Sequence, residues 1–211
     1  MELWNVRLGA KSTELVHDLA PGFGHALLSP LFTYVFRTLR VGAAVWEHAD
    51  IWFTLHDGAN LALFEQEHGK DVERNAYNAR CFAEARRKKA LVVGEFGGYS
   101  DLFVPVVAHG KVAGIIVTGP LSSERATSTA VEERWHSLTG RAAHPTDAEF
   151  ASYLAATLNL LVLAPTEFRA LERLLRALAT LMAGEGDATE LANQIEMDRS
   201  VLDPVRAAER A

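Results

Sequence analysis

The chain contains two groups of short segments in which apolar residues alternate with polar ones or run continuously, as they do in β-strands. The first group occupies residues 41–46, 51–56 and 60–64, and the second occupies residues 91–96, 102–108 and 112–118. Asp57-Gly58 and His109-Gly110-Lys111 each separate two neighbouring segments and are typical of hairpin turns. The pattern therefore predicts a sheet of five or six strands, mostly antiparallel.

Longer segments with helical periodicity precede, separate and follow these strands. The first twenty residues are expected to be helical from about Lys11, before a loop at Pro21-Gly22-Phe23-Gly24. Pro30 is expected to open a helix at 31–40, because proline is tolerated in a first helical turn. The other predicted helices lie at 72–89, 123–138, 147–163, 166–182 and 187–202. This order of elements predicts an α+β fold in one domain, with helices flanking the central sheet.

Composition narrows the class of protein. Of the 211 residues, 49% are hydrophobic and 23% are charged, which is typical of a globular protein. The net charge of −6 argues against direct binding of nucleic acid. The single cysteine excludes a disulfide scaffold, and no apolar stretch is long enough to cross a membrane. We therefore expect a cytoplasmic location and no membrane partner.

One stretch of the sequence resembles a known family. It reads Asn-Ala-Tyr-Asn-Ala-Arg-Cys-Phe from Asn75, then Tyr-Ser-Asp-Leu-Phe-Val-Pro-Val from Tyr99, and it ends at Leu121. Arg80-Cys81, Asp101, Pro105, Gly110, Gly114 and Gly119 match the pattern of the PocR-type sensory domain, a relative of the GAF and PAS domains. Phe96-Gly97-Gly98 stands where that family often has Cys-His-Ala-Gly, and this departure argues against a two-cysteine redox or metal site.

The resemblance implies a GAF/PAS-like sensor core at 41–163, between an N-terminal helical segment (1–40) and C-terminal signalling helices (164–211). Such a domain binds a small molecule between its sheet and a helix. It passes the signal through its last helices to an effector, such as a transcription regulator, cyclase or kinase, which we expect to be missing from this chain. The alternatives are a ligand-free dimerisation or protein-interaction module with a GAF-like fold, and an enzyme without recognisable motifs.

The expected ligand site combines aromatic and polar side chains from the first strands, the 72–89 helix and the turn before residue 101. Its candidate residues are Trp46, Trp52, His56, Tyr77, Cys81, Phe96, Tyr99 and Asp101. Trp52 and His56 share one face of their strand because side chains alternate with a two-residue period. Trp46 and Phe96 could equally be ordinary core residues, Cys81 a small buried apolar residue, and Asp101 a turn cap.

The sequence contains no motif for catalysis or metal binding. The eight histidines do not form a His-x-x-x-His or His-Glu-x-x-His pair, and no nucleophile elbow or phosphate-binding loop is present. We therefore expect neither a catalytic residue, nor a metal, nor a cofactor. A mixed aromatic and polar pocket would favour a sensor, whereas an acid and a base within hydrogen-bond reach would favour an enzyme.

Leucines form a stripe along the predicted helix at 166–182. Leu171, Leu174, Leu178 and Leu181 recur at spacings of three and four residues. Such a stripe packs either on the helix's own domain or against a second copy of the chain. We expect a homodimer that changes its geometry when the ligand binds, with this helix as the signalling element. The pattern Leu191, Ile195 and Leu202 indicates either a connector to a downstream domain or a tail that folds on a partner.

Overall fold

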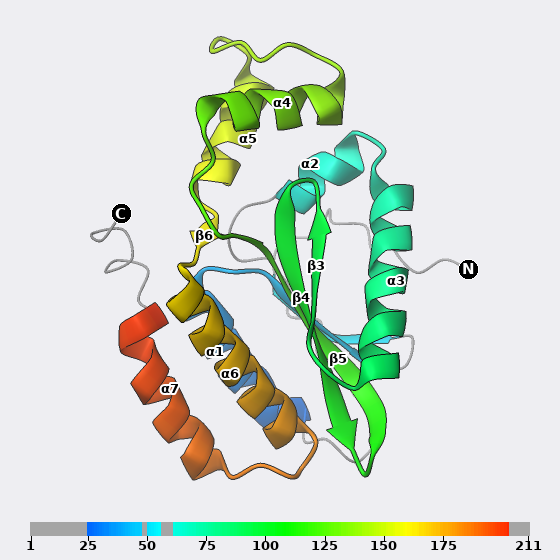
Figure 1. Ribbon diagram of the computed structural model, residues 1–211, viewed down its shortest axis with the longest axis vertical. Coiled ribbons are helices and arrows are strands. Elements are labelled where there is room, and N and C mark those ends of the chain that lie inside the picture. Colours follow the sequence, from blue (N-terminus) through cyan, green and yellow to red (C-terminus); the bar gives the residue numbers. More distant parts are fainter. Residues whose placement is uncertain (1–24, 48–49, 56–60, 203–211) are drawn as a thin grey trace.

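The strands form one sheet in the order β2-β1-β5-β4-β3, and a sixth short strand, β6, pairs with β5 (Figure 1). The computed structural model describes residues 25–47, 50–55 and 61–202. The strands are β1 (Ala43–Glu47), β2 (Asp50–Leu55), β3 (Val92–Phe96), β4 (Tyr99–Ala108), β5 (Lys111–Ser122) and β6 (Leu161–Val162). All pairs are antiparallel except β5–β6. The predicted α+β fold with a central antiparallel sheet is confirmed.

The hairpin of β4 and β5 is the centre of the sheet. Phe103 lies opposite Val117 and Val104 opposite Ile116. His109 and Gly110 make the turn with positive φ angles of 48° and 73°. The two strands that the sequence placed on either side of His109-Gly110-Lys111 are therefore neighbours, as predicted.

Helices cover both faces of this sheet because neighbouring residues of β4 point to opposite sides. Leu102, Val104 and Val106 belong to the core shared with α1 (His25–Leu39) and α6 (Pro165–Met182). Phe103 instead belongs to the core under α3 (Asp71–Lys88), on the other face. Figure 1 shows α3 on one side of the sheet, with α6 and α7 (Ala188–Leu202) on the other.

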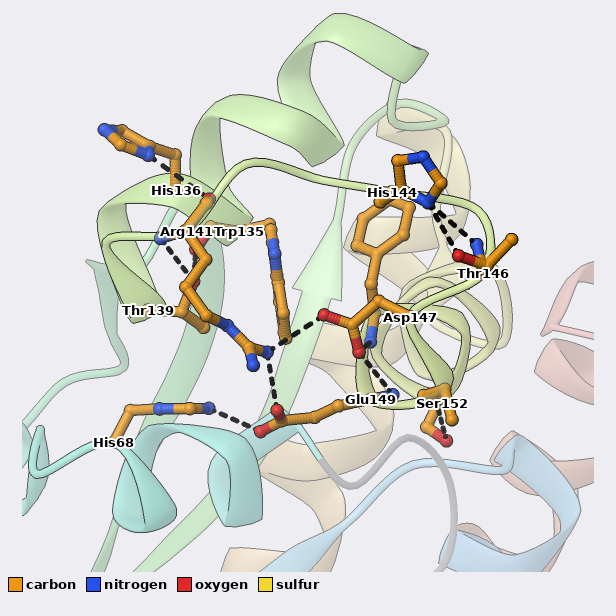
Figure 2. A network of polar contacts seen from close by, with 12 residues as sticks. His68, Trp135, His136, Thr139, Arg141, His144, Thr146, Asp147, Glu149 and Ser152 are labelled. Carbon is orange, nitrogen blue, oxygen red and sulfur yellow. Dashed lines mark hydrogen bonds and ion pairs between the residues drawn. The ribbon is translucent and has the colours of Figure 1, made fainter.

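Three helices form a separate group beyond one end of the sheet, which we call the end lobe: α2 (Leu61–Glu67), α4 (Ser128–Thr139) and α5 (Ala148–Leu158). Asp147 caps α5, as predicted, by accepting hydrogen bonds from the first backbone amides of the helix. Figure 2 shows a polar bridge across the lobe. Glu149 contacts His68, the residue directly after α2, at 2.9 Å and Arg141 at 2.5 Å. This bridge joins α2 to the α4–α5 pair.

Three predicted elements were wrong. Of the strand predicted at 60–64, residues 61–64 belong to α2 instead, and Leu61 and Phe64 pack into the end lobe from one face of this helix. The predicted helix at 147–163 ends at Leu158, and β6 follows it. Helix α1 does not open at Pro30 but contains it, and buried Leu28 packs into the core from the turn before.

Some predicted features lie outside the described residues. These are the helix from about Lys11, the loop at Pro21-Gly22-Phe23-Gly24 and the turn at Asp57-Gly58. Within the described ranges, no helix combines the length and the apolar character that crossing a membrane requires.

Candidate functional site

A charged network lies buried between α2, α3 and the start of β4. Arg74 of α3 binds Glu65 of α2 with two nitrogens, Nε to Oε2 at 2.7 Å and Nη2 to Oε1 at 2.8 Å. Its third nitrogen, Nη1, donates to Oδ2 of Asp101 on β4 at 2.6 Å. The exposed fractions of these side chains are 15% for Arg74, 10% for Glu65 and 8% for Asp101. Each nitrogen of this guanidinium is therefore satisfied by a carboxylate.

Aromatic rings complete the network. The hydroxyl of Tyr77 donates to Oδ2 of Asp101 at 3.0 Å. The ring of Phe96 lies 5.2 Å from that of Tyr77, and the guanidinium of Arg74 lies 4.2 Å from the centre of the Phe96 ring. A cation over an aromatic face is favourable, so Phe96 and Tyr77 hold the guanidinium from a second direction. The combination is a buried, mixed aromatic and polar site.

The helical period explains which residues of α3 reach this site. Arg74, Tyr77, Asn78, Cys81 and Ala85 recur at spacings of three and four residues and therefore lie on one face of the helix. That face packs on the sheet, with Tyr77, Cys81 and Ala85 in the core around Phe103. Arg74 lies at the N-terminal end of the same face, where the core meets the end lobe.

Burial dominates the electrostatics of the network. It raises the pKa of Glu65 and of Asp101 above their ordinary values, although Arg74 opposes this effect. Burial alone would lower the pKa of Arg74, but the two carboxylates raise it, so the guanidinium stays charged. Burial and Asp101 together raise the pKa of Tyr77 far above its usual range. The site therefore holds one fixed positive charge and two carboxyl groups that resist full ionisation.

These pKa shifts predict how stability depends on pH. Between the ordinary values of 4.5 for Glu65 and 3.8 for Asp101 and their higher folded values, the folded state binds more protons than the unfolded chain. Their contribution to the free energy of unfolding therefore falls as the pH rises through that window. We expect the stability advantage of the wild type over Asp101→Asn to shrink in urea titrations as the pH rises from 3.8, the ordinary pKa of Asp101, through its raised folded pKa.

Glu84 supplies a control of opposite sign, because its pKa is lowered by Lys88 on the exposed side of the same helix. The contribution of a carboxyl group with a lowered folded pKa is lost as the pH falls. The difference between wild type and Glu84→Gln should therefore grow, slightly, as the pH rises. A stability difference for Asp101→Asn that grows in the same way would contradict the raised pKa values.

Helix α3 approaches the sheet closely at Gly94. A Cβ atom at this position would overlap the hydroxyl of Tyr77 and would lie 2.8 Å from Sγ of Cys81. Tyr77 and Cys81 are 3% and 4% exposed. Side chains therefore fill the space between this part of α3 and β3.

We expect Gly94→Ala to lower the free energy of unfolding by about 1–3 kcal/mol, because the added methyl group overpacks this contact. Tyr77→Phe removes the nearest atom, so the cost of Gly94→Ala should be smaller in a Tyr77→Phe background. A double-mutant cycle measured by chemical denaturation tests the coupling. Equal costs in both backgrounds would contradict the close approach.

The predicted site residues divide among several places. Those on the α3 face of the sheet are Trp46, Tyr77, Cys81, Phe96 and Asp101. Trp46 packs there against Phe82, with ring centres 5.5 Å apart. Asp101, which could have been a turn cap, instead anchors the charged network.

The remaining predicted residues lie elsewhere. Trp52 is on the opposite face of the sheet, where its ring contacts Phe32 of α1 at 5.7 Å. Tyr99 belongs to the core of the end lobe. His56 lies outside the described residues.

Sequence reasoning missed Glu65 and Arg74. A signal for Arg74 was present, since it lies three and seven residues before Tyr77 and Cys81, on the same helical face. Glu65 had no such signal, because residues 60–64 were interpreted as a strand.

The leucine stripe of α6 packs inside the chain. Leu171, Leu174 and Leu178 are 0%, 3% and 0% exposed and belong to the core formed with the sheet and α1. Leu181 is partly buried at the edge of the same core. Of the two arrangements that the stripe allows, the structure contains packing on the helix's own domain.

Neither the metal-ligand groups nor comparison with known proteins assigns a function to this chain. In the ranges that the structure describes, no three His, Cys, Asp or Glu side chains are grouped to hold a metal ion. No family model, curated protein or solved structure matches this chain.

Proposed function

We propose that this chain is a sensory domain that binds a small molecule between its sheet and the N-terminal end of α3, beside Arg74, and transmits binding through its C-terminal helices to an effector. The observation that carries this proposal is the buried Glu65–Arg74–Asp101–Tyr77 network. A protein-interaction module that binds no ligand needs only apolar side chains between its sheet and α3. Charged groups are costly to bury and are commonly concentrated where a protein recognises or responds to something.

The position of Asp101 on β4 gives the network a route to α6. Asp101 faces α3, and its neighbour Leu102 faces the core shared with α6. A shift of β4 that accompanies a change in the network would therefore reach the packing of α6 directly. A ligand acts in this way only by its different affinity for two arrangements of the domain.

Tyr77 and Asp101 are also a proton donor and acceptor within hydrogen-bond reach, which is the feature that would favour an enzyme. The pKa values argue for a structural pair. General acid–base catalysis is most effective when the pKa is near the working pH, whereas that of Tyr77 is raised far above it. We therefore favour sensing over catalysis.

Mass spectrometry of the denatured, freshly purified protein tests the proposal. We expect a small molecule to copurify with the wild type and with Glu95→Gln, an exposed carboxylate on β3, and to be lost from Asp101→Asn. Circular dichroism verifies that the variants are folded. Adding the compound back should change hydrogen exchange in α6.

Two results would contradict the proposal. The first is that no compound copurifies and that no member of a metabolite library raises the melting temperature. The second is that binding persists unchanged in Asp101→Asn. If light scattering then showed a ligand-free dimer, the protein-interaction module would be the better description.

A further inference from the structure

The outer face of α3, which points away from the sheet, is apolar along its middle. Its apolar residues recur at spacings of four, three and four positions and are Val72, Ala76, Ala79 and Ala83. All four are exposed, and Val72 is 72% exposed. The solvent face of a surface helix normally carries charged and polar residues. This apolar line indicates that a second surface can cover α3, although it does not identify that surface.

The two ends of α3 carry opposite charges. The first turn is acidic and the last turn is basic, and the residues concerned are Asp71, Glu73, Arg86, Arg87 and Lys88. Each of these residues is exposed. Within one chain this order of charges stabilises the helix dipole. The same order makes α3 complementary to a copy of itself that runs in the opposite direction, because each acidic end then lies beside a basic end.

The other charged residues of α3 leave the middle of its outer face uncharged. Arg74 belongs to the buried network on the inner face. The guanidinium of Arg80 lies over the ring of buried Tyr77, 5.8 Å from its centre. Glu84 forms an ion pair with Lys88 on the same helix. The outer face therefore presents an apolar middle between two oppositely charged ends.

We propose that α3 pairs with α3 of a second copy of this chain, antiparallel and about a two-fold axis. Figure 1 shows α3 along one margin of the molecule, where its outer face is open to a second chain. In this pair the apolar lines of the two helices cover each other, and Glu73 of each helix lies near Arg87 of the other. A two-fold interface uses the same patch on both chains, so it must be self-complementary, and α3 meets this condition.

A polyanion, such as nucleic acid or an anionic lipid surface, fits α3 less well. It would be attracted by the basic end alone and repelled by the acidic end and by the net charge of −6. It would also leave the apolar line uncovered, whereas a second copy satisfies both ends and covers the line. The pairing goes beyond the sensing function proposed above, because the sensing site uses the opposite face of α3.

The size of the contact sets the strength of the dimer. Helix α3 has 18 residues and is about 27 Å long. One pair of helices of this length buries less than the area of about 1,200 Å² at which standard protein interfaces begin. We therefore expect a weak dimer, with a Kd on the order of 10–100 µM. Well below that concentration the chain is monomeric, so a stability measured there is that of the monomer.

Analytical ultracentrifugation of the whole chain, over concentrations that span this Kd, tests the proposal. We expect the wild type to change from monomer to dimer. Glu73→Arg and Arg87→Glu should each weaken dimerisation by about 10-fold or more, because each brings like charges together at both ends of the pair. Glu133→Arg, which alters an exposed glutamate of α4, is the matched control and should dimerise normally. Circular dichroism verifies that the variants are folded.

Combining the two changes tests the orientation of the helices. A chain with both changes has exchanged its charges and should dimerise about as well as the wild type. A mixture of the two single variants should form a mixed dimer, because the new arginine of one chain meets the new glutamate of the other. A parallel pair would not be rescued by the double change, since it brings identical ends together.

The proposal is overturned if the wild type stays monomeric at every concentration, or if it forms a dimer that neither single change weakens. It is equally overturned if the double change does not restore dimerisation. Binding of DNA or anionic vesicles by a monomeric wild type, with loss of that binding in Arg87→Glu, would instead assign the basic end to a polyanion. Asp101→Asn, which tests the sensing site, should dimerise normally, so failure of one proposal is distinguishable from failure of the other.

Discussion

Replacing Arg74 with leucine is expected to lower the free energy of unfolding by about 3–5 kcal/mol, because it leaves two buried carboxylates without their counter-ion. Glu65 and Asp101 are too buried for water to replace the lost hydrogen bonds fully. Urea denaturation followed by circular dichroism measures the loss. It should be smaller at low pH, where the carboxyl groups are protonated.

Arg87→Leu is the matched control, because Arg87 is an exposed residue on the same helix. It should change the free energy of unfolding by less than about 0.5 kcal/mol. Replacing Glu65 and Asp101 together with Arg74 by apolar residues should recover part of the lost stability. A loss below about 1 kcal/mol for Arg74→Leu would mean that the network contributes little to the fold.

The second large effect is expected for Leu178→Ala, which should lower the free energy of unfolding by about 2–5 kcal/mol. Leu178 is fully buried between α6 and the sheet, so truncation leaves a cavity in the core. Leu158→Ala is its control, since Leu158 is 70% exposed on α5. That change should stay within about 0.5 kcal/mol.

Protein concentration distinguishes a core helix from a dimer seam. If Leu178 packs only within its own chain, Leu178→Ala has the same effect on stability at low and high concentration. If the leucine stripe formed a dimer instead, the loss would grow with concentration, because only the dimer would be weakened. Light scattering of the wild type over the same range reports the oligomeric state independently.

Sequence patterns predicted strand pairing best where the two paired strands are neighbours along the chain. β4 and β5 are joined by only two residues, His109 and Gly110, so their alternating apolar pattern and their turn were sufficient to predict both strands and their pairing. The short apolar run at 60–64 was misinterpreted because a run of this length fits a strand or a helix equally well. Contacts with α5 favour the helix, because the ring of Phe64 packs on that of Tyr153 with ring centres 5.6 Å apart.

The candidate site was predictable only in part, for a similar reason. Tyr77 was predicted as an aromatic residue on the helix beside the sheet, and Asp101 as a polar residue on a glycine-rich turn near the second group of strands. Their partner Arg74 shares the helical face of Tyr77, but that spacing shows only that it faces the sheet and does not show which carboxylates it meets. Its two carboxylates lie 9 and 27 positions away. A buried ion pair between such positions depends on tertiary packing that no local pattern encodes.

The pairing of β5 with β6 has a consequence for how this architecture can vary. Leu121 lies beside Leu161, and Ser122 beside Val162, so the chain leaves the sheet and returns to it at neighbouring points. Residues 123–160, which contain α4 and α5, thus start and finish side by side, as inserted modules do. Chains of the same architecture could carry a shorter, longer or unrelated insertion here without altering the order of the five long strands. The surface that this insertion presents could then change, while the sheet and α6 stay the same.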